Sequence, residues 1–285
     1  MGNNLTRIVI SKYGKVSEND LDMIIKLMKE CYNRLKPHNV SLVDLYVFEK
    51  SSLAEAFLSR ERERIGVKTS GFEEFFFAMH DAWRGIPRII LCLDRLRDLP
   101  KLVIVGGVHH EVGHTILHGS IEYYFLTFPK PLLELMRLFN FSEKYATDLL
   151  YLASVAVKDY EVTRLLCQHG YIEDQAAFVK FLLKISEDDL VSWNLSQGNP
   201  LLEALYIMGL FKPIGCAIPL LNSEDFGNEI KEYLKNYVSH LPKELSSLIL
   251  NIVEEKFAKL ENDTLNNISK ILYSYKPILD TLFRQ

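Results

Sequence analysis

The sequence has little of what marks disulfide-stapled or nucleic-acid-binding proteins. Its 285 residues include four cysteines (Cys31, Cys92, Cys167 and Cys216) and no C-x-x-C pair. Scattered cysteines are typical of reduced thiols, not of a disulfide framework or a cysteine zinc site. The net charge of −4 leaves no overall basic surface for nucleic acid. These absences predict a cytoplasmic protein that binds no nucleic acid.

Signals for secretion or membrane insertion are also missing. Residues 1–6 are polar, and no apolar signal-peptide core follows them. The most apolar stretch, Pro200 to Leu221, falls short of the roughly 20 unbroken residues that span a membrane. The residues that interrupt it are Glu203, Gly209, Lys212, Pro213 and Pro219. We therefore expect no membrane contact and interpret this stretch as core helix.

The strongest chemical signal is the segment 109–118, H-H-E-V-G-H-T-I-L-H, which contains the pattern H-E-x-x-H. Residues four apart share one face of a helix, so His110 and His114 can direct two imidazoles to one point. Catalytic zinc binds such nitrogens at about 2.1 Å and keeps one position open for water. Glu111 lies beside that face and can deprotonate the water. The pattern predicts one zinc ion per chain, with Glu111 as the catalytic base.

The residues around the motif predict a buried helix. Asp98 as N-cap and Pro100 in the first turn mark its start, and Gly119 marks its end. Burying three polar side chains unpaired in such a helix is costly, which favours metal binding over histidines that only fill a core. Glycine within a helix costs about 1 kcal/mol relative to alanine. Gly113 therefore suggests that a second helix packs closely here. Gly106 and Gly107 suggest the same close packing earlier in the helix, or a looser helix start.

The segment His110 to Gly119, H-E-V-G-H-T-I-L-H-G, resembles the active-site helix of zincin metallopeptidases. It is most similar to the H-E-L-G-H-x-x-L-H helix of the ImmA/IrrE-like family. The resemblance covers this helix and, more weakly, the elements just before it, and it does not extend to the C-terminal half. It implies a peptide or protein substrate, which an edge strand of a small sheet can bind through main-chain hydrogen bonds.

The third metal ligand must come from a later element, and a long helix predicted from Ser142 to Gln168 carries two candidates. Asp159 and Glu161 interrupt its apolar sequence. Because they are two residues apart, they point about 200° apart and only one can face the metal. Alternatively, both acids face water beside Lys158 and Arg164. Several zincin families place the third ligand first in a motif of acid, aromatic, any, small apolar, then Asp or Asn. Residues 159–163 resemble it, which favours Asp159 and keeps Glu161 as the alternative.

Two further residues could support the site without binding the metal. Thr163 occupies the last place of that motif and could steady the helix or a histidine nitrogen. His118 lies four residues after His114 and drifts about 40° further round the helix, so it borders the site. A capping role for His118 is equally open. His109 points about 100° away from His110, and we expect it to be structural.

Residue patterns predict an α+β fold. Alternation and β-branched or aromatic residues predict strands at 6–11, 41–48, 71–80 and 88–93. The aromatic residues of 71–80 also fit a helical stripe, but we favour a strand there. Caps and apolar stripes predict helices at 17–35, 52–64, 98–118 and 142–168, and helical patterns dominate the rest. We predict a small zincin-like sheet with the active-site helix within residues 1–170. Residues 171–285 would form a helical C-terminal region packed on it.

Together these features predict a zinc-dependent metallopeptidase in which Glu111 activates a zinc-bound water. Two other functions fit the same residues. One is a zinc-binding regulatory or interaction protein with little protease activity, and the other is a metal-dependent hydrolase of a non-peptide amide. An accessible edge strand beside the motif helix favours the peptidase, whereas a deep closed pocket without one favours the non-peptide hydrolase.

Overall fold

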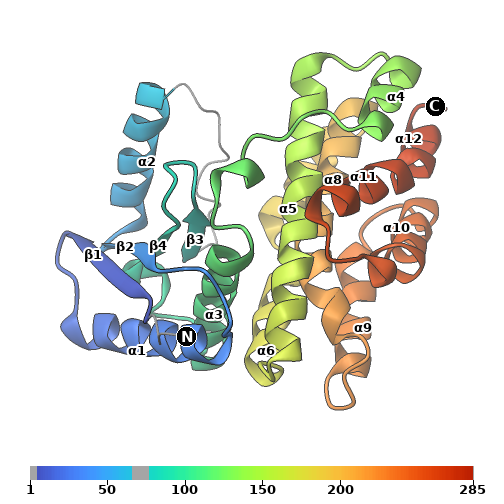
Figure 1. Cartoon of the computed structure of the whole chain (residues 1–285). Helices are drawn as coiled ribbons and strands as arrows, with labels where there is room; N and C mark the ends of the chain where they lie inside the picture. Colours follow the sequence, from blue (N-terminus) through green and yellow to red (C-terminus); the bar gives the residue numbers. More distant parts are fainter. Residues whose placement is uncertain (1–4, 66–76, 285) are drawn as a thin grey trace. The chain divides into compact units, whose positions relative to one another are not determined.

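A computed structural model of the chain describes residues 5–65 and 77–284 (Figure 1). The fold is α+β, as predicted, with one small sheet and many helices. The chain forms two compact units. The first unit comprises Met1–Phe125 and Glu173–Gln175, and the second comprises Leu126–Ile172 and Ala176–Gln285.

The sheet of the first unit has four strands in the order β1-β2-β4-β3. The first three in this order, β1 (Arg7–Tyr13), β2 (Leu42–Phe48) and β4 (Arg88–Cys92), are parallel. At the edge, β3 (Ala78–Asp81) runs antiparallel to β4, and the two correspond to the strands predicted at 71–80 and 88–93. Residues 71–76 of the strand predicted there lie outside the described residues.

Helices cover both faces of the sheet. On one face, α2 (Ser51–Ile65) contacts β2 and β4 and shares a small core with Phe48 and Ile90. On the other face lie α1 (Glu18–Arg34) and α3 (Lys101–Leu117), which contact each other (Figure 1). Because successive strand residues point to opposite faces, each buried strand contributes side chains to the contacts with the helices on both faces of the sheet. The motif helix α3 is thereby held directly against the strands that precede it.

A buried hydrogen bond joins α1 to α3. The Tyr32 hydroxyl lies 2.7 Å from Thr115 Oγ1, and Thr115 Oγ1 also donates to the carbonyl of Val112. Burial raises the pKa of the Tyr32 phenol well above its ordinary value, so this side chain stays neutral. The contact fixes the last turns of α3, in which the motif histidines lie.

The start of α3 differs from the prediction. Pro100 is the N-cap and no side chain caps the helix, so the assignment of Asp98 as N-cap is wrong. The reason is that the chain still turns through residues 96–98, after the short 3-10 helix η1 (Leu93–Arg95). At the other end His118 is the C-cap, and Gly119 follows where a Cβ atom would overlap the Thr115 carbonyl oxygen.

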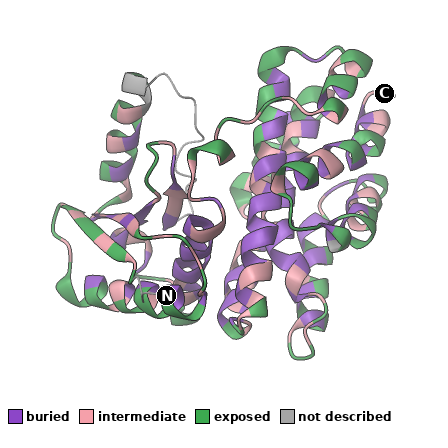
Figure 2. Ribbon diagram, in the orientation of Figure 1, coloured by how far each residue is buried: buried purple, intermediate pink, exposed green. Residues whose placement is uncertain are grey.

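The second unit is built around α5 (Glu143–Gln168) and α8 (Pro200–Ala217), whose residues are largely buried (Figure 2). The two helices approach closely at Gly215, where a Cβ atom would overlap the Ala156 carbonyl oxygen. The later helix α11 (Thr264–Ser274) also packs on α5. Because α5 shares its core with these later helices, the units divide at residue 125 and not at the predicted 170.

The other helices of the second unit surround this pair. They are α4 (Lys130–Phe139), α6 (Glu173–Leu182, whose first three residues belong to the first unit), α7 (Glu187–Ser196), α9 (Gly227–Val238), α10 (Lys243–Glu255) and α12 (Lys276–Leu282).

The predicted interruption of the apolar stretch after residue 200 is wrong. Helix α8 continues through Pro213 to Ala217, and η3 (Ile218–Leu220) follows it directly. Among the described residues, Pro200–Leu220 is the one stretch with the length and hydropathy of a membrane span. Ile207, Phe211 and Ile214 of this helix lie in the core of the second unit. Packing in that core offsets the hydrogen bond that a proline within a helix removes.

Candidate metal centre

The two motif histidines converge on α3. His110 Nε2 and His114 Nε2 lie 3.1 Å apart, and both residues are buried together with Glu111. Two nitrogens that bind one tetrahedral zinc at about 2.1 Å are separated by about 3.4 Å. The pair is therefore within about 0.3 Å of the spacing that a shared metal ion requires, and the helix supplies it through two residues one turn apart.

His118 contacts the second ring nitrogen of His114. The two Nδ1 atoms lie 3.3 Å apart, and His118 is fully buried. The rings of His118 and Tyr123 are nearly perpendicular, with their centroids 5.0 Å apart. A metal-binding histidine usually donates its other ring N–H to a partner that fixes the orientation of the ring. In this geometry His118 can accept that hydrogen bond.

A fourth histidine, His80, comes from the edge strand β3. Its Nδ1 lies 3.3 Å from Glu111 Oε2, and its ring stacks on that of His114 with the centroids 3.9 Å apart. The sequence motif does not point to this residue. The available signal is a polar residue near the end of an aromatic-rich strand, and its partner can be found only from the tertiary structure.

Phe77 and Gly107 bring β3 close to α3. A Cβ atom on Gly107 would overlap the ring of Phe77, which directly precedes β3. The neighbour that requires glycine at this position is therefore an aromatic side chain, and not the second helix that the sequence suggests. A bulkier residue at 107 would push the strand away from the motif helix.

A buried ion cluster holds the far end of β3. Asp81 pairs in register with Arg88 of β4, and Arg88 Nη2 lies 2.7 Å from Asp81 Oδ2. Arg88 Nη1 lies 2.8 Å from Glu61 Oε2 on α2. The rings of Tyr46 and Trp83 lie 5.0 and 5.5 Å from the guanidinium carbon, within cation–π range. These contacts satisfy a charge that would otherwise be costly to bury.

His109 has the structural role expected for it. Its Nδ1 lies 2.7 Å from Asp174 Oδ2, and Gln175 Nε2 donates to the Gly106 carbonyl at 2.9 Å. Both partners belong to the short segment Glu173–Gln175 of the first unit. These bonds hold α3 to the segment Glu173–Gln175.

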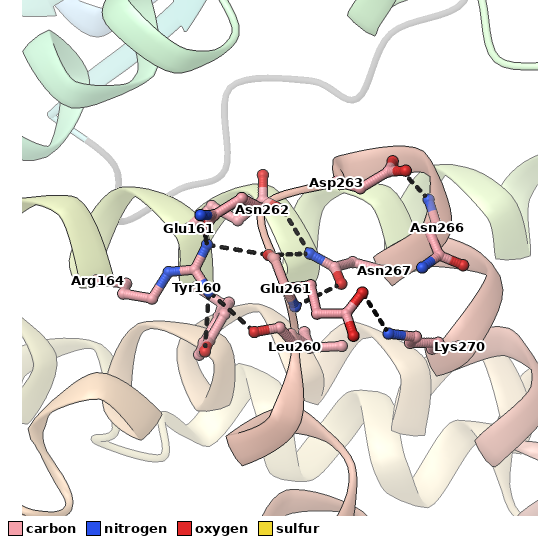
Figure 3. A network of polar contacts seen from close by, with 10 residues as sticks. All are labelled: Tyr160, Glu161, Arg164, Leu260, Glu261, Asn262, Asp263, Asn266, Asn267 and Lys270. Carbon is pink, nitrogen blue, oxygen red and sulfur yellow. Dashed lines mark hydrogen bonds and ion pairs between the residues drawn. The ribbon is translucent and has the colours of Figure 1, made fainter.

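The two candidate third ligands lie on α5 in the second unit, and their surroundings differ. Both oxygens of Glu161 are bonded to α11: Thr264 Oγ1 donates to Oε2 at 2.7 Å and Asn267 Nδ2 donates to Oε1 at 2.8 Å. Figure 3 shows the adjoining contacts, in which Arg164 binds the carbonyls of Leu260 and Glu261. Glu161 thus joins two helices of the second unit.

The other acid, Asp159, is buried as well, so the alternative in which both acids face water is wrong. One of its carboxylate oxygens lies within 4.8 Å of Cys216 Sγ on α8. Burial lowers the pKa of the neighbouring Lys158 to about 8, against the opposing effect of Asp159 and Glu161. Thr163, one turn further along α5, is fully buried. The acidic part of α5 is therefore an interior polar region.

A pocket of about 510 Å³ lies at the C-terminal end of α3. Thr115 and Tyr123 line it together with the start of β2 and the turn Gly85–Pro87 between β3 and β4. Tyr123 also contacts His118, so the pocket adjoins the histidine cluster through that ring.

No protein-family model, curated protein or solved structure matches the chain.

Proposed function

We propose that the chain is a zinc-dependent metallopeptidase. The observation that carries this proposal is the 3.1 Å separation of His110 Nε2 and His114 Nε2 on a buried helix, with Glu111 beside them. The contact between His114 Nδ1 and His118 Nδ1 supports it, because metal-binding histidines are commonly oriented through their second nitrogen.

In this proposal His110 and His114 hold one zinc ion per chain, and Asp159 is the third ligand. The support for Asp159 is its place in the motif at residues 159–163 and the engagement of both Glu161 oxygens by Thr264 and Asn267. Zinc, when bound, supplies a Lewis acid that lowers the pKa of water toward about 7 and polarises a carbonyl group.

Glu111 performs the proton transfers. Its carboxylate takes a proton from the attacking water as the new C–O bond forms at the peptide carbonyl carbon. It then gives that proton to the amide nitrogen as the C–N bond breaks, so the products are a carboxylic acid and an amine. His118 holds the ring of His114, and the buried position of all three motif residues keeps competing water away.

The edge strand favours a peptide as the substrate. β3 is the last strand in the sheet order of the described residues, and it contacts α3. The backbone groups on its outer side can pair with an extended peptide, as in other proteins that add a strand to a sheet edge. A small non-peptide amide would gain nothing from this strand.

The experiment that tests the proposal compares wild type with Glu111→Gln. The variant should bind zinc at one equivalent per chain, because Glu111 is not a ligand. Hydrolysis of a quenched-fluorescence peptide library should fall by about 10²–10⁴-fold, the usual contribution of general acid–base catalysis. Zinc content is measured by elemental analysis, and Glu30→Gln on the exposed face of α1 is the matched control. Cleavage by Glu111→Gln at the wild-type rate would refute this mechanism.

A further inference from the structure

We propose that His80 is a positioning residue that fixes the Glu111 carboxylate for proton transfer. The inference rests on the proposed function of Glu111 and adds a residue from outside the motif helix. It is carried by two contacts that His80 makes at once. Its Nδ1 lies 3.3 Å from Glu111 Oε2, and its ring stacks on His114 at a centroid distance of 3.9 Å and an interplanar angle of 10°.

The close approach of His80 Nδ1 would select one orientation of the carboxylate. Among the described residues, Glu111 Oε2 has no hydrogen-bond partner, and a small rotation of the His80 ring lets Nδ1 donate to it. The side chain of Glu111 then loses rotational freedom, and Oε1 is left to exchange protons with the reactants. A general base that is held in place avoids the entropy cost of finding its reactive orientation. The stacking explains why a flat ring is suited to this position, since it fits against the imidazole of His114.

Several independent contacts determine where His80 lies. Alternate residues of a strand face opposite sides, so Met79 and Asp81 point to the α2 face while His80 points to α3. Met79 packs in the small core beneath α2, and Asp81 binds Arg88. Phe77 rests on Gly107 at the start of the strand. The strand is thus anchored on both sides of His80, which is what a positioning residue needs.

The test uses the full chain loaded with zinc and two substitutions of His80. His80→Ala should lower kcat by about 10–100-fold, the usual cost of losing a residue that supports a metal site, with KM and zinc content unchanged. His80→Asn should recover most of that loss, because its amide N–H can donate where Nδ1 does. His169→Asn, at the end of α5, is the control and should match wild type.

Three results would overturn the inference: a wild-type kcat in His80→Ala, a loss of zinc together with activity in that variant, or no recovery in His80→Asn. A second measurement covers the case in which His80→Ala does not fold. In ¹⁵N-histidine-labelled wild type, the His80 Nδ1 proton should be protected from exchange, and Glu111→Ala should abolish that protection. Unchanged protection would refute the contact. Because this readout needs no hydrolysis, a protein with the protected proton and no peptidase activity would count against the proposed function and not against the contact.

Discussion

At the scale of single residues, Glu161 shows that the spacing of two acids in the sequence does not identify which of them can bind a metal. Asp159 and Glu161 stand two apart on one helix, and spacing alone cannot choose between them. The two acids are distinguished by the hydrogen bonds that Thr264 and Asn267 donate to Glu161. These partners come from a helix about a hundred positions later in the chain. The motif histidines needed no such partner, because residues one helical turn apart are neighbours by local geometry. The sequence does not identify His80, or exclude Glu161 as a ligand, because the contacts of both residues are with residues far away in the chain.

The two acids should therefore respond differently to substitution. Under the proposed function Asp159→Ala removes a ligand, so it should weaken zinc binding by more than the roughly 10–100-fold that loss of a supporting residue costs. Glu161→Gln should keep wild-type zinc affinity. It should also lower the free energy of unfolding by about 1–3 kcal/mol, since buried hydrogen bonds to a charged group are weakened.

Titration against a competing chelator measures the first effect, and urea unfolding measures the second. The assignment of Asp159 fails if Glu161→Gln loses zinc while Asp159→Ala retains it. Wild-type zinc affinity in both variants would show that neither acid is a ligand.

At the scale of elements, local signals identified most of the first unit. Alternating patterns located β1, β2 and β4, and the predicted caps Ser17 and Ser142 both bond to the backbone at the start of their helices. The errors fall where tertiary contacts override local preference. Asp98 resembles an N-cap, yet the chain turns for a few more residues, and Pro213 resembles a helix stop, yet the core of the second unit keeps α8 continuous.

Two glycine substitutions should have opposite effects on stability. Gly107→Ala should destabilise the protein by about 1–3 kcal/mol, because the new methyl group would overlap the buried Phe77 ring. It should also reduce peptide hydrolysis by displacing β3. Gly209→Ala on α8 has no atom within 4 Å of the new group and should stabilise by up to about 1 kcal/mol.

Thermal unfolding followed by circular dichroism, with a peptide assay on the same samples, checks the pair. A Gly107→Ala protein as stable and active as Gly209→Ala would mean that the close approach of Phe77 to α3 does not hold β3 in place.

At the scale of the whole molecule, the sequence alone places the division between the units too late. Asp159 and Glu161 on α5 are candidate ligands for the same metal as the motif histidines. The sequence therefore suggests that α5 and the motif helix belong to one unit that extends to about residue 170. The packing of α5 follows its apolar residues instead, which share a core with α8 and α11. A few polar residues can carry the chemistry of a helix, but its far more numerous apolar residues determine what it packs against.

A chain that ends after Gly170 should therefore fold poorly. It would keep α5 and lose α8 and α11, leaving buried positions such as Leu149 and Val157 exposed to water. Exposed apolar patches of this kind cause association. Size-exclusion chromatography should show aggregates. Circular dichroism should show less helix than residues 1–170 have in the full chain. A monomeric product that melts cooperatively at the temperature of the full chain would contradict the shared core.

The short edge strand β3 also bears on solubility. An open strand edge that can accept a substrate can equally accept the edge of another molecule, which is a common route to aggregation. Here the strand is four residues long and ends at Asp81, whose carboxylate is held by Arg88. So few backbone groups give a second copy of the chain little to pair with. The short length of β3 thus limits edge-to-edge pairing between copies and the growth of fibrils.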